Sequence, residues 1–234
     1  MQARLRQSRE IAPGVRHFEF EVLDVERFDF NPGQFVSLSA EVGSAYIGTK
    51  IITRAYSLAS MPNGNRFELC LNLVEGGHFS SLLFDMKPGD TVDMAGPVGF
   101  FVWRQPMSEA ILVATGTGIA PFRGMLQQRF ASGVQAKVHL VFGVRYEASL
   151  MYREEFERLA SEHGEFTFWP VLSRPPADWQ GRSGHVQEHV MEALGERRDV
   201  DIYICGLKAM VDDLRGRLKA AGVDRKRLIY EKYD

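Results

Sequence analysis

The pattern of apolar residues changes near Val102–Ser108, and this change most constrains the fold. Before it, short segments alternate apolar and polar residues between turns such as Asn31–Gly33 and Lys87–Asp90. Such segments are typical of antiparallel strands with one face in a core. After it, nearly continuous apolar runs alternate with helical patterns, as in a parallel sheet covered by helices on both faces. The sequence therefore predicts two domains: an antiparallel β-barrel at 1–104 and an α/β doubly wound parallel sheet at 105–234.

The same patterns predict the individual elements. In the first domain we expect strands at Val15–Val22, Gln34–Leu38, Arg66–Val74 and Thr91–Met94, and a short helix at Ser81–Met86. In the second we expect strands at Ala110–Thr115, Lys137–Val144, Phe166–Leu172, Asp201–Cys205 and Leu228–Tyr233. Helices are expected between them at Pro121–Ser132, Tyr152–His163, Gly184–Leu194 and Lys208–Ala221.

Composition narrows the classes of function. The 234 residues are 45% hydrophobic, which is enough for one core in each domain. The net charge is −2 and the chain has no basic block, which argues against nucleic acid or an anionic membrane as the main partner. No apolar run approaches the roughly 18–20 residues of a membrane span. Because the N-terminal segment also lacks the apolar stretch of a secretory signal, a cytoplasmic location is predicted.

The cysteines and histidines of the sequence do not form a recognisable metal-binding pattern. Cys70 and Cys205 are the two cysteines, too few for an all-cysteine iron–sulfur centre or a disulfide framework. Cys70 lies in an alternating segment and is interpreted as a core residue. His185 and His189 are four residues apart on an expected helix, but no third ligand lies in a recognisable pattern.

Arg54, Tyr56 and Ser57 place a cation, an aromatic ring and a hydroxyl on one extended segment. Alternate residues of a strand share a face, so Arg54 and Tyr56 point one way and Ser57 another. A guanidinium for phosphate, a ring for stacking and a hydroxyl for a ring nitrogen suit a flat anionic ligand such as a flavin nucleotide.

Two glycine-containing turns are candidates for phosphate binding. Gly76-Gly77-His78-Phe79-Ser80-Ser81 lies where a helix begins, so that backbone N–H groups and the helix dipole can face a pyrophosphate. Gly116-Thr117-Gly118-Ile119-Ala120-Pro121 follows a predicted strand and has proline in the first helical turn, where its missing N–H costs nothing.

These segments occur in an order that resembles the ferredoxin–NADP⁺ reductase superfamily, especially bacterial ferredoxin/flavodoxin reductases and the flavin–nicotinamide modules of oxygenase reductases. The resemblance spans about residues 5–234. The series consists of Arg54–Ser57, Gly76–Ser81, Gly96–Phe101, Gly116–Pro121, Cys205–Met210 and Glu231–Tyr233. Leu207 stands where relatives usually have proline.

The resemblance implies a role for each of these residues. Arg54 would bind the flavin phosphate, Tyr56 would stack on the isoalloxazine, and Ser57 would hydrogen-bond near N5. A diphosphate would lie at Gly77, Phe79, Ser80 and Ser81, which favours FAD over FMN, although no adenine-binding pattern separates the two. A second dinucleotide would lie at Thr115, Gly116, Thr117, Gly118 and Pro121. Cys205 and Gly206 would lie beside the nicotinamide, with Glu231 and Tyr233 close to the flavin. The residues expected to take part in catalysis are Ser57, Cys205, Glu231 and Tyr233.

The choice of dinucleotide rests on Arg145, Ser173, Arg174 and Arg182. The acidic residue expected for a free ribose is missing, and Arg145 stands there instead. Hydroxyl and guanidinium groups suit a 2′-phosphate, which favours NADPH. The segment Pro175–Arg182 also resembles NADH-using relatives, so NADH stays open.

The resemblance implies an FAD-dependent NAD(P)H oxidoreductase. Hydride would pass between nicotinamide and flavin N5, and single electrons would pass to or from ferredoxin or flavodoxin, or to an oxygenase component. Two alternatives remain from the sequence. One is a reductase that uses free flavin as a substrate, and the other is an electron-transfer subunit bound permanently to a larger enzyme.

Overall fold

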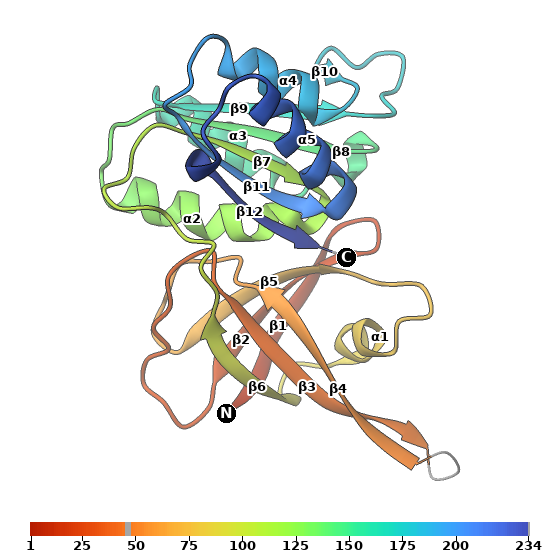
Figure 1. Cartoon of the computed structure of the whole chain (residues 1–234). Coiled ribbons are helices and arrows are strands. Elements are labelled where there is room, and N and C mark those ends of the chain that lie inside the picture. The colour runs from red at the N-terminus through yellow and green to blue at the C-terminus, as the bar shows by residue number, and fades with distance from the viewer. Residues whose placement is uncertain (45–47, 234) are drawn as a thin grey trace. The chain divides into compact units, whose positions relative to one another are not determined.

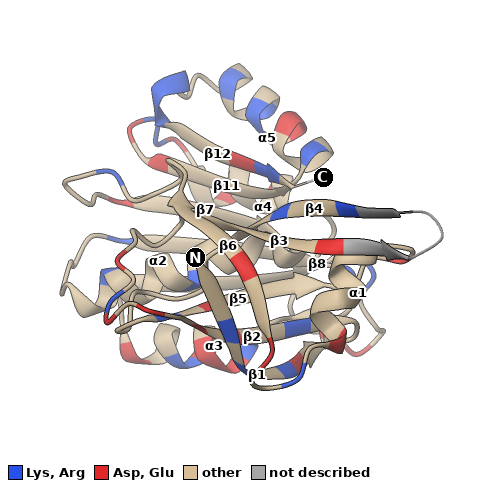
Figure 2. Ribbon diagram, turned by 90° about the horizontal axis from the view of Figure 1, so that it is seen from below, with Lys and Arg blue, Asp and Glu red and all other residues tan. Residues whose placement is uncertain are grey.

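The computed structural model describes residues 1–44 and 48–233, and the chain divides into two compact units (Figure 1). Unit 1 contains Met1–Val102 together with Ala120–Ala131. Unit 2 contains Trp103–Ile119 and the chain from Ser132 onward. Lys and Arg are interspersed with Asp and Glu over the elements of both units (Figure 2), and the net charge is −2.

Unit 1 is built on an antiparallel sheet with the strand order β4-β3-β6-β1-β2-β5. An isolated bridge between Leu58 and Leu69 joins the two edges, so the sheet closes into a barrel. Phenylalanine rings on alternate positions fill the interior, for example Phe20 stacked on Phe67 at 5.5 Å. The elements are β1 (Gln2–Ala12), β2 (Val15–Val22), β3 (Phe35–Ser44), β4 (Gly48–Ser57), β5 (Arg66–Asn72), α1 (His78–Asp85), β6 (Thr91–Val98) and α2 (Ala120–Ala131).

Unit 2 is built on a parallel sheet with the strand order β10-β9-β8-β7-β11-β12. Helices α4 and α5 share one core on one face of this sheet, whereas Phe156 of α3 packs on Phe168 of β9. The strands are β7 (Ala110–Thr115), β8 (Val138–Val144), β9 (Phe166–Leu172), β10 (Arg182–Ser183), β11 (Asp201–Leu207) and β12 (Leu228–Tyr233). The helices are α3 (Arg153–Glu162), α4 (Val186–Leu194) and α5 (Lys208–Ala220), with short 3₁₀ turns η1 (Gly116–Ile119), η2 (Glu147–Ser149) and η3 (Arg225–Arg227).

The order of strands in unit 2 reverses at β7. The chain runs outward from β7 through β8 and β9 to β10, then returns to place β11 on the other side of β7. In open α/β sheets, the carboxyl ends of the strands at such a reversal form the ligand crevice. Here those ends are Thr115 of β7 and the Cys205–Leu207 end of β11, which lie side by side in the sheet.

The two-domain fold class is confirmed, while several predicted bounds are wrong. Strand β1 was not predicted, because most of its side chains are polar and Ala3 and Leu5 are its main inward residues. Helix α1 begins at His78 rather than Ser81, since the Ser81 N–H donates to the Gly77 carbonyl oxygen at 3.2 Å and closes an earlier turn. Strand β10 was also missed. The predicted Phe166–Leu172 and Leu228–Tyr233 match their strands. Within the described ranges, the helices are all too short or too polar to cross a bilayer.

Candidate functional site

The first cluster lies on β4 in unit 1. The Tyr56 ring stacks on Phe79 of α1, with centroids 6.2 Å apart and an interplanar angle of 21°. Burial raises the pKa of Tyr56 to about 12, partly opposed by Arg54, so the phenol stays neutral at physiological pH. Arg54 is exposed and donates to the Thr53 carbonyl oxygen at 2.9 Å, while Ser57 is buried. One strand thus offers a cation, a stacked ring and a hydroxyl, as the sequence predicted.

The second cluster is the turn that opens α1. The Ser80 hydroxyl accepts from the Val74 N–H at 3.1 Å and donates to the Gly77 carbonyl at 3.2 Å, so it is committed to the turn. A Cβ at Gly77 would lie 2.8 Å from that hydroxyl, which explains the glycine. The exposed Ser81 donates to the same carbonyl at 2.8 Å. An open hollow lies beside this turn, lined by Glu41, Gly76, Gly77, His78, Ser81, Leu82 and Asp85.

The third cluster lies in unit 2, at the reversal between β7 and β11. Gly118 approaches the end of β11 so closely that a Cβ there would lie 2.4 Å from the Cys205 carbonyl oxygen. A Cβ at Gly206 would lie 2.2 Å from Thr115 Oγ1. This hydroxyl is buried and has no hydrogen-bond partner among the described residues. Because buried polar groups are normally paired, an unpaired donor between two backbone turns indicates a place for a ligand.

Two further residues predicted to bind the dinucleotide lie close to this cluster in the sequence. Thr117 lies within η1, and Pro121 lies in the first turn of α2, as its missing N–H predicted.

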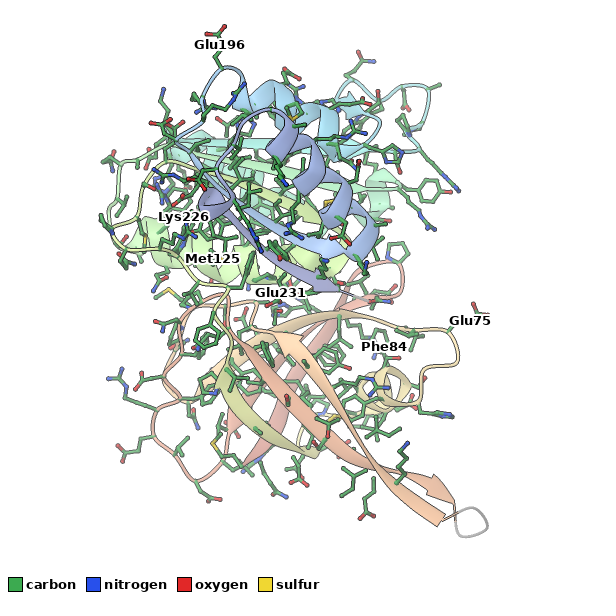
Figure 3. The ribbon with its side chains drawn as sticks, viewed as in Figure 1. Glu75, Phe84, Met125, Glu196, Lys226 and Glu231 are labelled. Carbon is green, nitrogen blue, oxygen red and sulfur yellow. The ribbon has the colours of Figure 1, made fainter. Side chains whose placement is uncertain are left out.

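Cys205, Glu231 and Tyr233 come together in unit 2 because β11 and β12 pair in parallel. The register places Cys205 beside Glu231 and Leu207 beside Tyr233 (Glu231 is labelled on β12 in Figure 3). The Tyr233 side chain hydrogen-bonds to the Cys205 thiol. Burial and the Glu231 carboxylate raise the pKa of the Cys205 thiol well above its usual range, although Tyr233 lowers it in part. The fully buried thiol is therefore protonated at neutral pH, so it can contact a neighbouring ring but is a poor nucleophile.

The four residues predicted to bind the 2′-phosphate of NADPH fall into two groups. The Ser173 and Arg174 N–H groups bond to the Val144 and Arg145 carbonyls at 3.0 and 2.9 Å, which joins the carboxyl ends of β8 and β9. Arg145 and Arg174 are both exposed there. Arg182 instead binds both carboxylate oxygens of Glu192, at 2.5 and 2.9 Å.

Arg182 is held further by its ring contacts. Its guanidinium lies 3.3 Å from the centroid of Trp169, and one of its nitrogens lies 3.1 Å from His189 Nδ1. A guanidinium with both a bidentate carboxylate and an aromatic face has little left to offer a phosphate.

Sequence reasoning did not select Tyr146. Arg174 donates to the Tyr146 hydroxyl at 3.2 Å, and Tyr146 is exposed despite its size. Its position directly after Arg145, at the end of a predicted strand, was the available signal. An exposed ring beside two arginines can stack on a base.

Comparison with known proteins assigns both units. A model described as an oxidoreductase FAD-binding domain matches residues 2–103, and one described as an oxidoreductase NAD-binding domain matches residues 112–216. The chain is 38% identical to ferredoxin–NADP reductase B of Sorangium cellulosum over an alignment of 243 positions, covering 100% of this chain and 97% of that protein. It is 29% identical to the toluate 1,2-dioxygenase electron transfer component of Pseudomonas putida, covering 99% of this chain and 67% of that protein.

Solved structures share the fold. The Amycolatopsis cytochrome P450 reductase GcoB is 29% identical, with a TM-score of 0.87 over 99% of this chain and 69% of that chain. A ferredoxin NADP⁺ reductase from Neisseria gonorrhoeae, solved with FAD and NADP, is 24% identical, with a TM-score of 0.82 over 99% of this chain and 98% of that chain. At that identity the second likeness concerns the fold alone.

The fold and these clusters define a flavoprotein oxidoreductase that uses FAD and NAD(P)H. The chain belongs to the ferredoxin–NADP reductase family.

The observed clusters fit both cofactors. In unit 1, the stacked Tyr56 and the glycine turn before α1 suit a flavin and a diphosphate. In unit 2, the Thr115 hydroxyl, which has no partner in the part of the chain that the structure describes, and the glycines at the sheet reversal suit a dinucleotide.

Proposed function

We propose that this chain catalyses electron exchange between NADPH and a small electron-carrier protein, ferredoxin or flavodoxin. The observation that carries this proposal is the near-complete alignment with a ferredoxin–NADP reductase, combined with the Cys205–Tyr233 contact at the carboxyl end of β11. Electron-transfer components of dioxygenases are also relatives, so an oxygenase component is the second candidate partner. A cytoplasmic location and a domain boundary at 104/105 belong to the same proposal.

In unit 1, Arg54 would neutralise a flavin phosphate and Tyr56 would support one face of the ring. Ser57 would donate a hydrogen bond near N5, the position that accepts hydride. Gly77 and Ser81 would meet the diphosphate, while Phe79 backs Tyr56 and Ser80 keeps the turn closed. Bound FAD supplies the step from a two-electron donor to a one-electron acceptor.

In unit 2, Thr115 and the Gly116–Gly118 turn would hold the dinucleotide pyrophosphate. Pro121 follows in the chain, in the first turn of α2. Cys205 and Gly206 would lie beside the nicotinamide. Tyr233, whose side chain hydrogen-bonds to the Cys205 thiol, would have to move before a nicotinamide could reach that sulfur. Glu231 lies in the same register and would set the local charge.

The preference for NADPH rests on Arg145, Ser173 and Arg174. Their backbones are joined at the strand ends, and both guanidinium groups are exposed. Two cations and a hydroxyl favour a 2′-phosphate over a free ribose hydroxyl. Arg182 would contribute only by leaving Glu192, so its predicted phosphate role is the weakest of the four.

An absorption spectrum and two titrations test the proposal. The purified protein should be yellow, with about one FAD per chain, and anaerobic NADPH should reduce that FAD at lower concentration than NADH. The reduced protein should then reduce ferredoxin or flavodoxin. A colourless protein that oxidises NADPH only with added flavin would instead be a free-flavin reductase. Purification at equal stoichiometry with a larger enzyme would indicate a permanent subunit.

A further inference from the structure

Helix α2 contacts residues Ala59–Met61, which follow Ser57 at the end of β4. These contacts lie within unit 1. Three α2 residues on one helical face each meet the backbone of a consecutive residue. Arg123 Nη1 donates to the Ala59 carbonyl oxygen at 2.8 Å. A Cβ at Gly124 would lie 2.4 Å from the Ser60 carbonyl oxygen, and Gln127 Oε1 accepts from the Met61 N–H at 3.0 Å. Gln127 is four residues from Arg123 and three from Gly124, and residues at these two spacings are neighbours on a helix surface, so the three can reach one extended segment.

Strand β5 also binds the same segment. The Ala59 N–H donates to the Glu68 carbonyl at 2.8 Å, and the Glu68 N–H donates to Ser60 Oγ at 3.2 Å. Further back, the Leu58 N–H donates to the Gln34 carbonyl at 2.8 Å. The residues after Ser57 are therefore bound by α2, by β5 and by the Gln34 carbonyl.

Arg123 contacts both the Ala59–Met61 segment and β5. Its Nη1 also binds the Glu68 carboxylate, and the same carboxylate oxygen lies 3.5 Å from His17 Nε2. The Arg123 and His17 side chains are only 12% and 7% exposed. A largely buried charge pair of this kind is costly to disturb from one side, since the remaining charge loses its partner. Such a pair holds geometry more firmly than an exposed ion pair does.

We propose that Arg123 is a positioning residue for the flavin half of the reaction. Arg123 holds the Ala59 carbonyl and the Glu68 carboxylate together. It thereby fixes the segment that follows β4 and keeps the Ser57 hydroxyl aimed at the flavin. Gly124 and Gln127 support the same segment through their contacts with Ser60 and Met61. This inference rests on the proposed role of Ser57.

A double-mutant cycle tests the inference with the FAD-loaded enzyme. Ser57→Ala, Arg123→Gln and the double variant are compared for the rate of flavin reduction by NADPH and for the flavin midpoint potential. Misplacing a group by about 1 Å can cost up to roughly a hundredfold in rate, so each single variant should be slower by about tenfold or more. If Arg123 acts through Ser57, the double variant should be no slower than Ser57→Ala, and both single variants should shift the potential in the same direction.

Arg66→Gln is the matched control. Arg66 lies on the same strand as Glu68 but forms an exposed ion pair with Glu19 at 3.3 Å, so its rate and potential should stay at the wild-type values. If Arg123→Gln does not retain FAD, Gln127→Ala takes its place in the cycle, because it removes the Met61 contact without removing a charge.

The outcomes separate the two proposals. Multiplicative slowing in the double variant, or a wild-type rate in Arg123→Gln, overturns the positioning role while leaving the proposed function intact. A wild-type rate and potential in Ser57→Ala refutes the role of Ser57 in the proposed function, and the positioning role with it.

Discussion

Replacing Gly118 by alanine tests the geometry of the dinucleotide turn directly. The new Cβ would lie 2.4 Å from the oxygen and 2.7 Å from the carbon of the Cys205 carbonyl, where ordinary contacts begin at 3.4 Å. Both contacts are with backbone, so no side chain can rotate away. The turn and the end of β11 must separate by about 1 Å, and overpacking of this kind costs about 1–3 kcal/mol. The same displacement at a substrate-positioning turn can lower the rate by up to about a hundredfold.

Stopped-flow reduction by NADPH, taken together with thermal melting, measures both effects. We expect Gly118→Ala to melt at a lower temperature, to bind NADPH more weakly and to reduce its FAD more slowly, with a normal FAD content. Gly216→Ala is the control, because a Cβ at Gly216 in α5 meets nothing within 4 Å. Alanine is the better helix former by about 1 kcal/mol, so this variant should melt no lower and react normally. Wild-type melting and NADPH kinetics in Gly118→Ala would refute the close approach of the turn to Cys205.

Four other perturbations follow from the site. Arg54→Ala should weaken FAD retention by about ten- to a hundredfold, since a charge-assisted phosphate contact contributes about 1.5–3 kcal/mol; unchanged FAD occupancy after dialysis would argue against this role. Arg174→Ala should raise the Michaelis constant for NADPH and spare NADH, whereas equal effects would remove the reason for preferring NADPH. Tyr233→Ser should tighten NADP⁺ binding by removing the ring that competes with the nicotinamide. Tyr233→Phe keeps the ring but loses its hydrogen bond to Cys205, so its dissociation constant should lie between those of the wild type and Tyr233→Ser; equal dissociation constants in all three proteins would contradict this competition. Burial lowers the pKa of His139 to about 4, helped by Arg182 and Arg197, so the unfolded chain takes up this proton first and the free energy of unfolding falls as the pH drops from about 6.5 to 4. His139→Gln should remove about 1–2 kcal/mol of that fall after allowance for solvent screening, as urea unfolding at pH 7 and pH 5 can show; identical pH dependence would contradict it.

The sequence by itself determined the class of each half and most of the chemistry-bearing residues. Alternating segments can bury only one face, so the first hundred residues had to form an antiparallel sheet. The nearly continuous apolar runs, such as Ala110–Thr115, had to be buried on both faces. Arg54–Ser57 and Gly116–Pro121 were recognisable because short-range spacing sets which side chains share a strand face or a helix start. Strand β1 was not predicted, because polar residues outnumber its few apolar ones.

Only the tertiary structure decided which of these residues meet. The reversal of strand order at β7 brings the ends of β7 and β11 together, and no local periodicity encodes strand order. Arg182 looked equivalent to Arg174 in sequence, yet Glu192 and Trp169 bind its guanidinium. Helix α2 was expected beside the second sheet, whereas its contacts with Ala59–Met61 group it with the barrel. Each case depends on partners far away in the chain, and side-chain charge or apolar character alone does not specify them, because many distant partners satisfy the same local pattern.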